Sequence, residues 1–256
     1  MDLTALEPLF LPAGWEGVVA GRSKRIESWA EPCHEPGLPG HWSELMRQAP
    51  SLAAVPGLWG SYAEAVREMG FAPDQLVLGE QVHGTHVARV EDRRTSMQPN
   101  CDGLICSHSD LVLGVYVADC APILLWDPQA RAIGLLHSGR KGTEGSIVRI
   151  AIESMVRDLG ARRDRLRCWI GPCISSTHFE LDLPALIAAD AQLEGLSADA
   201  ITWSGHCTAS RVAEYYSYRR EKGSTGRHLF LLALRASPAE GLPLSHRLTS
   251  SSPSLA

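Results

Sequence analysis

Short apolar runs alternate with turn-forming residues over most of the chain. Apolar runs of about four to eight residues that are bounded by Gly, Pro, Asn or Asp are typical of buried strands. The pattern predicts strands at 17–20, 75–78, 86–90, 104–106, 111–117, 123–126, 132–136, 166–170, 201–204 and 229–234.

A helical spacing of apolar residues marks a smaller number of segments. In residues 146–159 apolar side chains recur every three or four positions, which puts them on one face of a helix. Residues 61–69 have a similar spacing and are followed by Gly70, a common helix stop. Helices are also predicted at 184–191 and 209–216. Many strands mixed with a few helices predict an α+β fold, with a core large enough for a single fold.

The domain organisation follows from the length and from the absence of a later linker. A chain of 256 residues makes one large domain or two small ones. Residues 31–40 are rich in Pro and Gly and predict a loop, and no later stretch resembles a linker. We therefore expect a single domain over residues 1–247. Residues 248–256 are small and polar and predict a loose C-terminal tail.

Composition and charge limit the classes of partner and the cellular location that we expect for this protein. Hydrophobic residues make up 45% of the chain and charged residues 21%, which argues against disorder and coiled coil. A net charge of −5 without a basic run disfavours nucleic acid and anionic membranes as partners. No segment reaches the roughly 18–20 apolar residues of a membrane helix, and the N-terminus lacks the basic region of a secretory signal. We therefore expect a cytoplasmic protein, with its seven cysteines present as free thiols or ligands.

Three candidate metal ligands stand at the ends of strand-like runs: His83, Cys120 and His137. Functional side chains collect where strands open into loops. Two imidazoles and a thiolate suit zinc and leave its fourth position open. The separations of 37 and 17 residues are too long for a local metal motif. The alternative for each residue is a hydrogen-bonded histidine or a small buried cysteine.

Three further groups are candidates for substrate binding. Arg140 and Lys141 lie in GRKGTEG, just before a predicted helix, where backbone N–H groups favour anions. Arg219 and Arg227 lie among turn formers at 217–227, and guanidinium groups bind phosphate bidentately. Cys173 follows Gly-Pro after a strand, and it could be a nucleophile, a pocket wall or a packing residue. Alternatively, the basic residues are solvated side chains on the surface that bind no ligand.

In the order of its motifs, the chain resembles the laccase-domain proteins, also called multicopper polyphenol oxidases or YlmD-like purine nucleoside phosphorylases. The resemblance covers roughly residues 75–235. It rests on QVHG (81–84), CDGLI (101–105), VADCAPILLWDP (117–128), the His137 loop, IGPCIS (170–175), CTAS (207–210) and SYRR…TGR (217–227). The family usually has HAGWRG where this chain has HSGRKG, so that Arg140 replaces a tryptophan and Lys141 an arginine.

The resemblance implies a layered α/β/β/α sandwich with mixed sheets, and a zinc or copper ion on His83, Cys120 and His137. It also implies a purine nucleoside and phosphate as small-molecule partners, through phosphorolysis of adenosine, inosine or methylthioadenosine, or through adenosine deamination. We expect Arg140, Lys141, Arg219 or Arg227 to hold phosphate. Asp102 or Asp119 is expected to act as an acid or base or to orient a ligand.

Several alternatives to a purine nucleoside enzyme remain at this stage. A copper-dependent polyphenol oxidase would need further copper ligands, and the chain has no HxH pair. A hydrolase with Cys120 as nucleophile and a histidine as base would act on a peptidoglycan precursor. A non-catalytic metal-binding protein is the third alternative. A monomer and a homodimer are equally compatible with the sequence.

Overall fold

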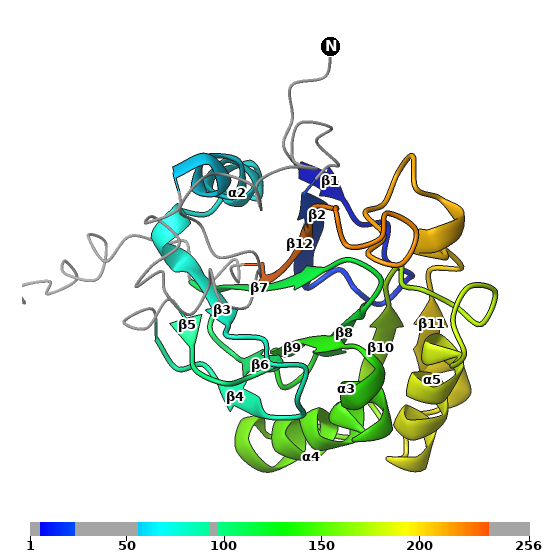
Figure 1. The fold of residues 1–256 in the computed structure, drawn as a ribbon. Helices are drawn as coiled ribbons and strands as arrows, with labels where there is room; N and C mark the ends of the chain where they lie inside the picture. The colour runs from blue at the N-terminus through cyan, green and yellow to red at the C-terminus, as the bar shows by residue number, and fades with distance from the viewer. Residues whose placement is uncertain (1–5, 24–55, 93–96, 236–256) are drawn as a thin grey trace, which may run out of the picture.

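A computed structural model describes residues 6–23, 56–92 and 97–235, and in it two six-stranded sheets lie face to face (Figure 1). The first sheet has the order β1 (Leu6–Pro8), β2 (Val18–Ser23), β12 (His228–Leu234), β7 (Val112–Val117), β3 (Leu76–Gly79) and β5 (Met97–Gln98). The second has the order β11 (Ile201–Trp203), β10 (Arg167–Ile170), β8 (Ala121–Asp127), β9 (Ala132–Ser138), β6 (Gly103–Cys106) and β4 (Val87–Arg89).

Both sheets contain parallel and antiparallel pairs. In the first sheet β3 runs parallel to β7 and β5, and the other pairs are antiparallel. In the second sheet β11 is parallel to β10 and β4 to β6, around an antiparallel centre of β10, β8, β9 and β6. The expected mixed sheets are confirmed.

Helices cover the outer faces of the two sheets (Figure 1). The α-helices of the described residues are α2 (Pro56–Glu68), α3 (Arg140–Glu144), α4 (Ile147–Leu159) and α5 (Leu183–Leu193). Helix α2 packs on the first sheet, and α4 and α5 pack on the second. Short 3-10 turns are η4 (Pro73–Gln75), η5 (Ala198–Ala200) and η6 (Thr208–Ser210). The layers confirm the α/β/β/α sandwich.

Alternate residues of the central strands face different layers, which explains their continuous apolar character. In β8, Leu124 and Trp126 enter the core between the sheets, while Ile123 and Leu125 face α4 and α5. Strand β12 divides its side chains in the same way, between the sheets and the layer of α2. Because successive side chains of a strand point to opposite faces, a strand covered on both faces is apolar at every position.

Most predicted elements are confirmed, and the differences have local causes. Strands β1 and β5 were not predicted, since they are only three and two residues long. The predicted helix at 209–216 is wrong, because only η6 forms and turns follow it. Long-range contacts hold this segment instead: Thr208 donates to Asp119, and Tyr215 bonds His206. The predicted turn at 139–145 contains the short helix α3.

Two predicted features, the loop at 31–40 and the tail at 248–256, lie outside the described residues. Among the residues the structure describes, no helix combines the length and apolar character that crossing a bilayer requires.

Candidate active site

The three candidate metal ligands meet at one end of the sandwich. His83 lies in the loop after β3, Cys120 in the turn that leads from β7 to β8, and His137 near the end of β9. Their ligand atoms all lie within 4.8 Å of one another. The β7–β8 turn passes from the first sheet to the second, so it carries Cys120 between a histidine from each side.

Asp102, just before β6, holds two of these ligands in place. Its carboxylate accepts hydrogen bonds from the backbone N–H groups of residues 82, 83 and 84 at 2.7–3.1 Å. It also accepts one from Nδ1 of His137 at 2.8 Å. His83 has a left-handed backbone, with φ of 60°, which these bonds maintain. With Nδ1 bound to Asp102, Nε2 of His137 is the atom left for a metal.

The electrostatics of the cluster favour the thiolate form of Cys120. Burial raises the pKa of this thiol, but His137 and His83 outweigh burial and lower the pKa to about 6. Burial lowers the pKa of His137, whereas the Cys120 thiolate and Asp102 raise it to about 9. Burial likewise opposes the ionisation of Asp102, but its bonds to His137 and the backbone lower its pKa. The thiolate is the form of cysteine that binds metals.

The cluster fits a metal ion in its donor set and in its surroundings. One sulfur and two imidazole nitrogens form a three-ligand set that leaves one zinc position open. Gly139 passes so close that a Cβ there would stand 2.8 Å from Sγ of Cys120. Any side chain at residue 139 would therefore collide with the ligand sulfur. The donor set accepts copper as well as zinc.

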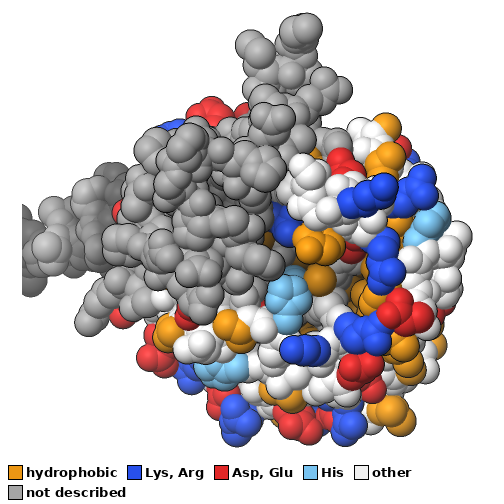
Figure 2. Space-filling view, in the orientation of Figure 1, with side chains coloured by type: hydrophobic (Ala, Val, Ile, Leu, Met, Phe, Trp, Pro, Cys, Tyr) orange, Lys and Arg blue, Asp and Glu red, His pale blue; other side chains and the backbone are white. Residues whose placement is uncertain are grey.

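A cavity of about 410 Å³ opens onto the three ligands. This volume lies within the ~300–1,000 Å³ range of small-molecule sites. Its walls include the apolar and aromatic side chains of Ile174, Phe179, Leu183 and Tyr218. In Figure 2, Lys and Arg side chains surround apolar and histidine side chains near the middle of the face shown.

Two of the predicted anion-binding residues share one aromatic ring in the cavity wall. The guanidinium groups of Arg140 and Arg219 lie over Phe179, with their central carbons 5.1 and 5.0 Å from the ring centroid. Both also pair with the carboxylate of Glu180, Arg140 through Oε1 and Arg219 through Oε2. Arg140 thus puts a second cation beside the cavity.

Asp119 fixes the loop that carries Arg219. It precedes Cys120 and has a φ of 79°. Its carboxylate accepts from the Thr208 hydroxyl at 2.6 Å and from the Arg219 backbone N–H at 2.7 Å. Asp119 therefore ties the turn that bears the metal ligand to the loop that bears the cation.

Arg227, Lys141 and Cys173 differ in their relation to the cavity. Arg227 lines it, but donates to carbonyls of its own loop at 2.9 and 3.1 Å. Lys141 is exposed on α3 and is not among the lining residues. Cys173 is fully buried, with a free thiol. Its backbone forms an isolated parallel β-bridge with that of Cys207, and neither residue lines the cavity. The geometry therefore groups Arg140, Arg219 and Arg227, without Lys141 and Cys173, around the cavity.

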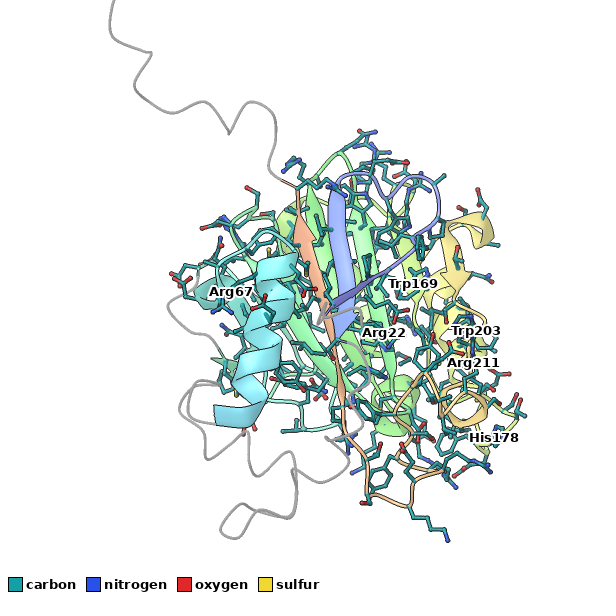
Figure 3. The ribbon with its side chains drawn as sticks, turned by 90° about the horizontal axis from the view of Figure 1, so that it is seen from above. Arg22, Arg67, Trp169, His178, Trp203 and Arg211 are labelled. Carbon is teal, nitrogen blue, oxygen red and sulfur yellow. The ribbon has the colours of Figure 1, made fainter. Side chains whose placement is uncertain are left out.

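Sequence reasoning missed the aromatic wall and the Glu180 carboxylate. Tyr218 adjoins the predicted residue Arg219, and Phe179 follows the predicted residue Cys173 by six positions. Their aromatic character was the only local signal. Two tryptophans that could offer a base-stacking surface lie away from the cavity: Trp169 packs between the sheets, and Trp203 is 39% exposed on the edge strand β11. Figure 3 shows Trp203 and Arg211 together at that outer side of the molecule.

Comparison with known proteins gives relatives of both sequence and fold. A purine nucleoside phosphorylase of Deinococcus radiodurans is 33% identical over 199 residues, or 67% of this chain and 75% of the relative. Adenosine deaminase RL5, from an unknown prokaryotic organism, is 28% identical over 62% of this chain and 75% of that protein. The solved structure of YlmD from Geobacillus stearothermophilus has a TM-score of 0.74 at 22% identity, covering 91% of this chain and 100% of that one.

The family match covers the second sheet, the first sheet apart from β1 and β2, and all the residues that line the cavity. Residues 60–182 and 175–235 match the family described as multi-copper polyphenol oxidoreductase laccase. These residues include the three ligands, Asp102 and the arginines of the cavity wall. With more than half of the sequence matched, the chain belongs to this family of laccase-domain proteins.

Proposed function

We propose that this chain is a metal-dependent enzyme that cleaves purine nucleosides with phosphate. The observation that carries the proposal is one cavity lined both by the His83–Cys120–His137 cluster and by three arginines. The relatives named purine nucleoside phosphorylase support it. In phosphorolysis a phosphate oxygen bonds to C1′ of the ribose while the bond from C1′ to the base nitrogen breaks. The base leaves with that electron pair and takes up a proton.

The metal cluster and Asp102 have distinct roles in this proposal. His83, Cys120 and His137 would hold a zinc ion, which would act as a Lewis acid that polarises a substrate oxygen. Asp102 orients His137 and the loop of His83. Its lowered pKa and its bonds to four N–H groups favour this positioning role over proton transfer. Such partners of metal-bound histidines typically change metal affinity by about 10–100-fold.

The cavity wall supplies complementary chemistry for the two substrates. Arg140, Arg219 and Arg227 offer guanidinium groups for the phosphate oxygens. Phe179, Tyr218 and Leu183 offer aromatic and apolar surface for a purine base. A nucleoside and a phosphate bound side by side in one cavity would react as an intramolecular pair, which lowers the entropic cost of their meeting.

Adenosine deamination is the second candidate reaction, and the relative named adenosine deaminase supports it. Deamination would need the metal site but no phosphate, so the arginines would have no anion to bind. A polyphenol oxidase is less well supported. In the part of the chain that the structure describes, no methionine lines the cavity, so the usual axial methionine of a blue-copper site has no candidate there.

Product analysis separates the two reactions. Zinc-loaded protein is incubated with adenosine, with and without phosphate, and the products are identified by mass spectrometry. The proposal predicts adenine and ribose 1-phosphate only when phosphate is present. Inosine formed without phosphate would establish deamination instead.

A Cys120→Ser variant is the control for the metal site in this assay. It is expected to lose the metal and all turnover, because a hydroxyl is a poor substitute for the thiolate, while circular dichroism keeps the wild-type signature. Full activity in a metal-replete Cys120→Ser protein would refute the site.

A further inference from the structure

The carboxylate of Glu180 pairs with two guanidinium groups of the cavity wall. Its Oε1 pairs with Arg140, and its Oε2 pairs with Arg219 at 3.4 Å. A carboxylate that gives one oxygen to each of two arginines uses the same donors that a phosphate would need. Arg140 and Arg219 line the cavity, whereas Glu180 is not among the lining residues.

We propose that Glu180 is an internal competitor for the anion site, which sets how tightly the cavity binds phosphate. The inference rests on the proposed function, because it takes phosphate as the anion. An incoming phosphate displaces the Glu180 carboxylate from Arg140 and Arg219. Glu180 therefore affects phosphate binding only through the two arginines, and it does not touch the reacting atoms.

The arginines have supports that do not depend on Glu180. Both lie over the ring of Phe179, and cation–π contacts hold guanidinium groups near aromatic faces. The backbone of Arg219 is held by the buried carboxylate of Asp119. Removing the charge of Glu180 therefore leaves two guanidinium groups beside the cavity without their counter-anion.

Exposure makes the displacement feasible. The side chains of Arg140, Arg219 and Glu180 are 43%, 52% and 52% exposed. Solvent-exposed ion pairs are weak, so a phosphate dianion can exchange with the carboxylate at little cost. Two cations against one carboxylate also leave a net positive charge here when Glu180 is in place.

Calorimetric titration of inorganic phosphate into zinc-loaded protein, without nucleoside, tests the inference. Glu180→Gln is expected to bind phosphate roughly fivefold more tightly than the wild type, as expected for release of exposed ion pairs. If Glu180 only held the arginines in place, its replacement would weaken phosphate binding. A gain in phosphate affinity therefore indicates that Glu180 competes with phosphate. The matched control is Glu214→Gln, which removes the same charge from a pair with Arg211 that does not line the cavity.

A double-mutant cycle with Arg140→Gln locates the effect. If Glu180 acts by occupying the arginines, Glu180→Gln gains less affinity in the Arg140→Gln background than in the wild type. Unchanged or weaker phosphate binding in Glu180→Gln would overturn the inference, as would an equal gain in Glu214→Gln. The titration needs no turnover, so a gain in Glu180→Gln without phosphorolysis would overturn the proposed function and leave the competition intact.

Discussion

Single residues in this site owe their roles to hydrogen bonds that reach far along the chain. Asp102 joins the loop of His83 to His137, which lies 35 residues away in sequence. Asp119 joins the Cys120 turn to Arg219, 100 residues away. Each carboxylate accepts bonds from two separate segments, so its loss would disturb both segments at once. The two acidic residues adjoining the metal motifs therefore act chiefly as organisers of the site.

The two histidines of the QVHGTH segment allow a paired test of the metal site. His83→Asn is expected to lower zinc content sharply, since it removes one of three ligands while Asn tolerates the left-handed backbone at this position. His86→Asn is the control, because His86 bonds the Asn100 carbonyl and is not in the cluster. Metal content is measured by elemental mass spectrometry after dialysis. Equal metal loss in both variants would contradict the assignment.

Cys207, beside His178, is expected to be the reactive thiol outside the metal cluster. Burial raises its pKa, but hydrogen bonds from Ser175 and Ser210 outweigh burial and lower it to about 6. Its Sγ lies 3.7 Å from Nδ1 of His178. In zinc-loaded protein, alkylation of Cys207 should be fast above pH 6 and slow as the pH falls through 6, because the thiolate reacts.

Peptide mapping by mass spectrometry measures this reactivity residue by residue. Cys168 is the internal reference, because burial raises its pKa to about 12. Alkylation of Cys207 that is no faster than that of Cys168 at neutral pH would contradict the prediction.

At the scale of elements, helix α5 carries part of the cavity wall and depends on its N-terminal cap. Asp182 caps α5 by accepting from the Ala185 backbone N–H at 3.2 Å, and its other oxygen accepts from Ser176 at 3.0 Å. Leu183, the first residue of α5, lines the cavity. The cap thus ties Ser176, in the loop that also carries Phe179 and Glu180, to the helix.

Asp182→Ala is expected to lower the free energy of unfolding by about 1 kcal/mol, the usual cost of losing an N-cap. Urea denaturation followed by circular dichroism measures the change. Asp182→Asn keeps an oxygen that can accept from the helix, and it should retain most of the stability. A stability loss as large in Asp182→Asn as in Asp182→Ala would contradict a capping role.

The local pattern of apolar residues predicts the central strands well, but it fails for the segment at 209–216. Strands β7, β8 and β12 were predicted within about two residues, because burial on both faces makes each a continuous apolar run. The segment at 209–216 has a helical pattern, yet Tyr215 and Tyr216 turn to contact His206 and His228 instead. Tertiary contacts override local preference where a segment has buried aromatic partners.

At the scale of the whole molecule, the candidate metal centre links the two sheets. His83 follows a strand of the first sheet, His137 belongs to the second, and Cys120 lies in the turn between them. An ion bound to all three residues would therefore resist separation of the layers. Ligands that bind only the folded state add stability in proportion to the logarithm of their concentration.

Zinc at about 100 times its dissociation constant is expected to stabilise the protein by about 2.7 kcal/mol. Thermal unfolding is measured with added zinc and with a chelator, in the wild type and in Cys120→Ser. The chelator should lower the Tm of the wild type and leave the Tm of the variant unchanged. The same chelator effect in both proteins would show that the stabilising metal binds elsewhere.

The sequence pattern by itself determined the α+β fold class, most strands and the three candidate ligands, whereas the layered arrangement was implied by the family resemblance. These features are local, because period and turn residues mark strands and strand ends mark exposed functional side chains. Only the tertiary structure decided that Asp102 binds His137, that His178 pairs with Cys207 and that Arg140 and Arg219 share Phe179 and Glu180. These partners are separated by 29 to 79 residues, apart from Phe179 and Glu180, which are neighbours. No local pattern records which distant loops the packing of the two sheets brings together.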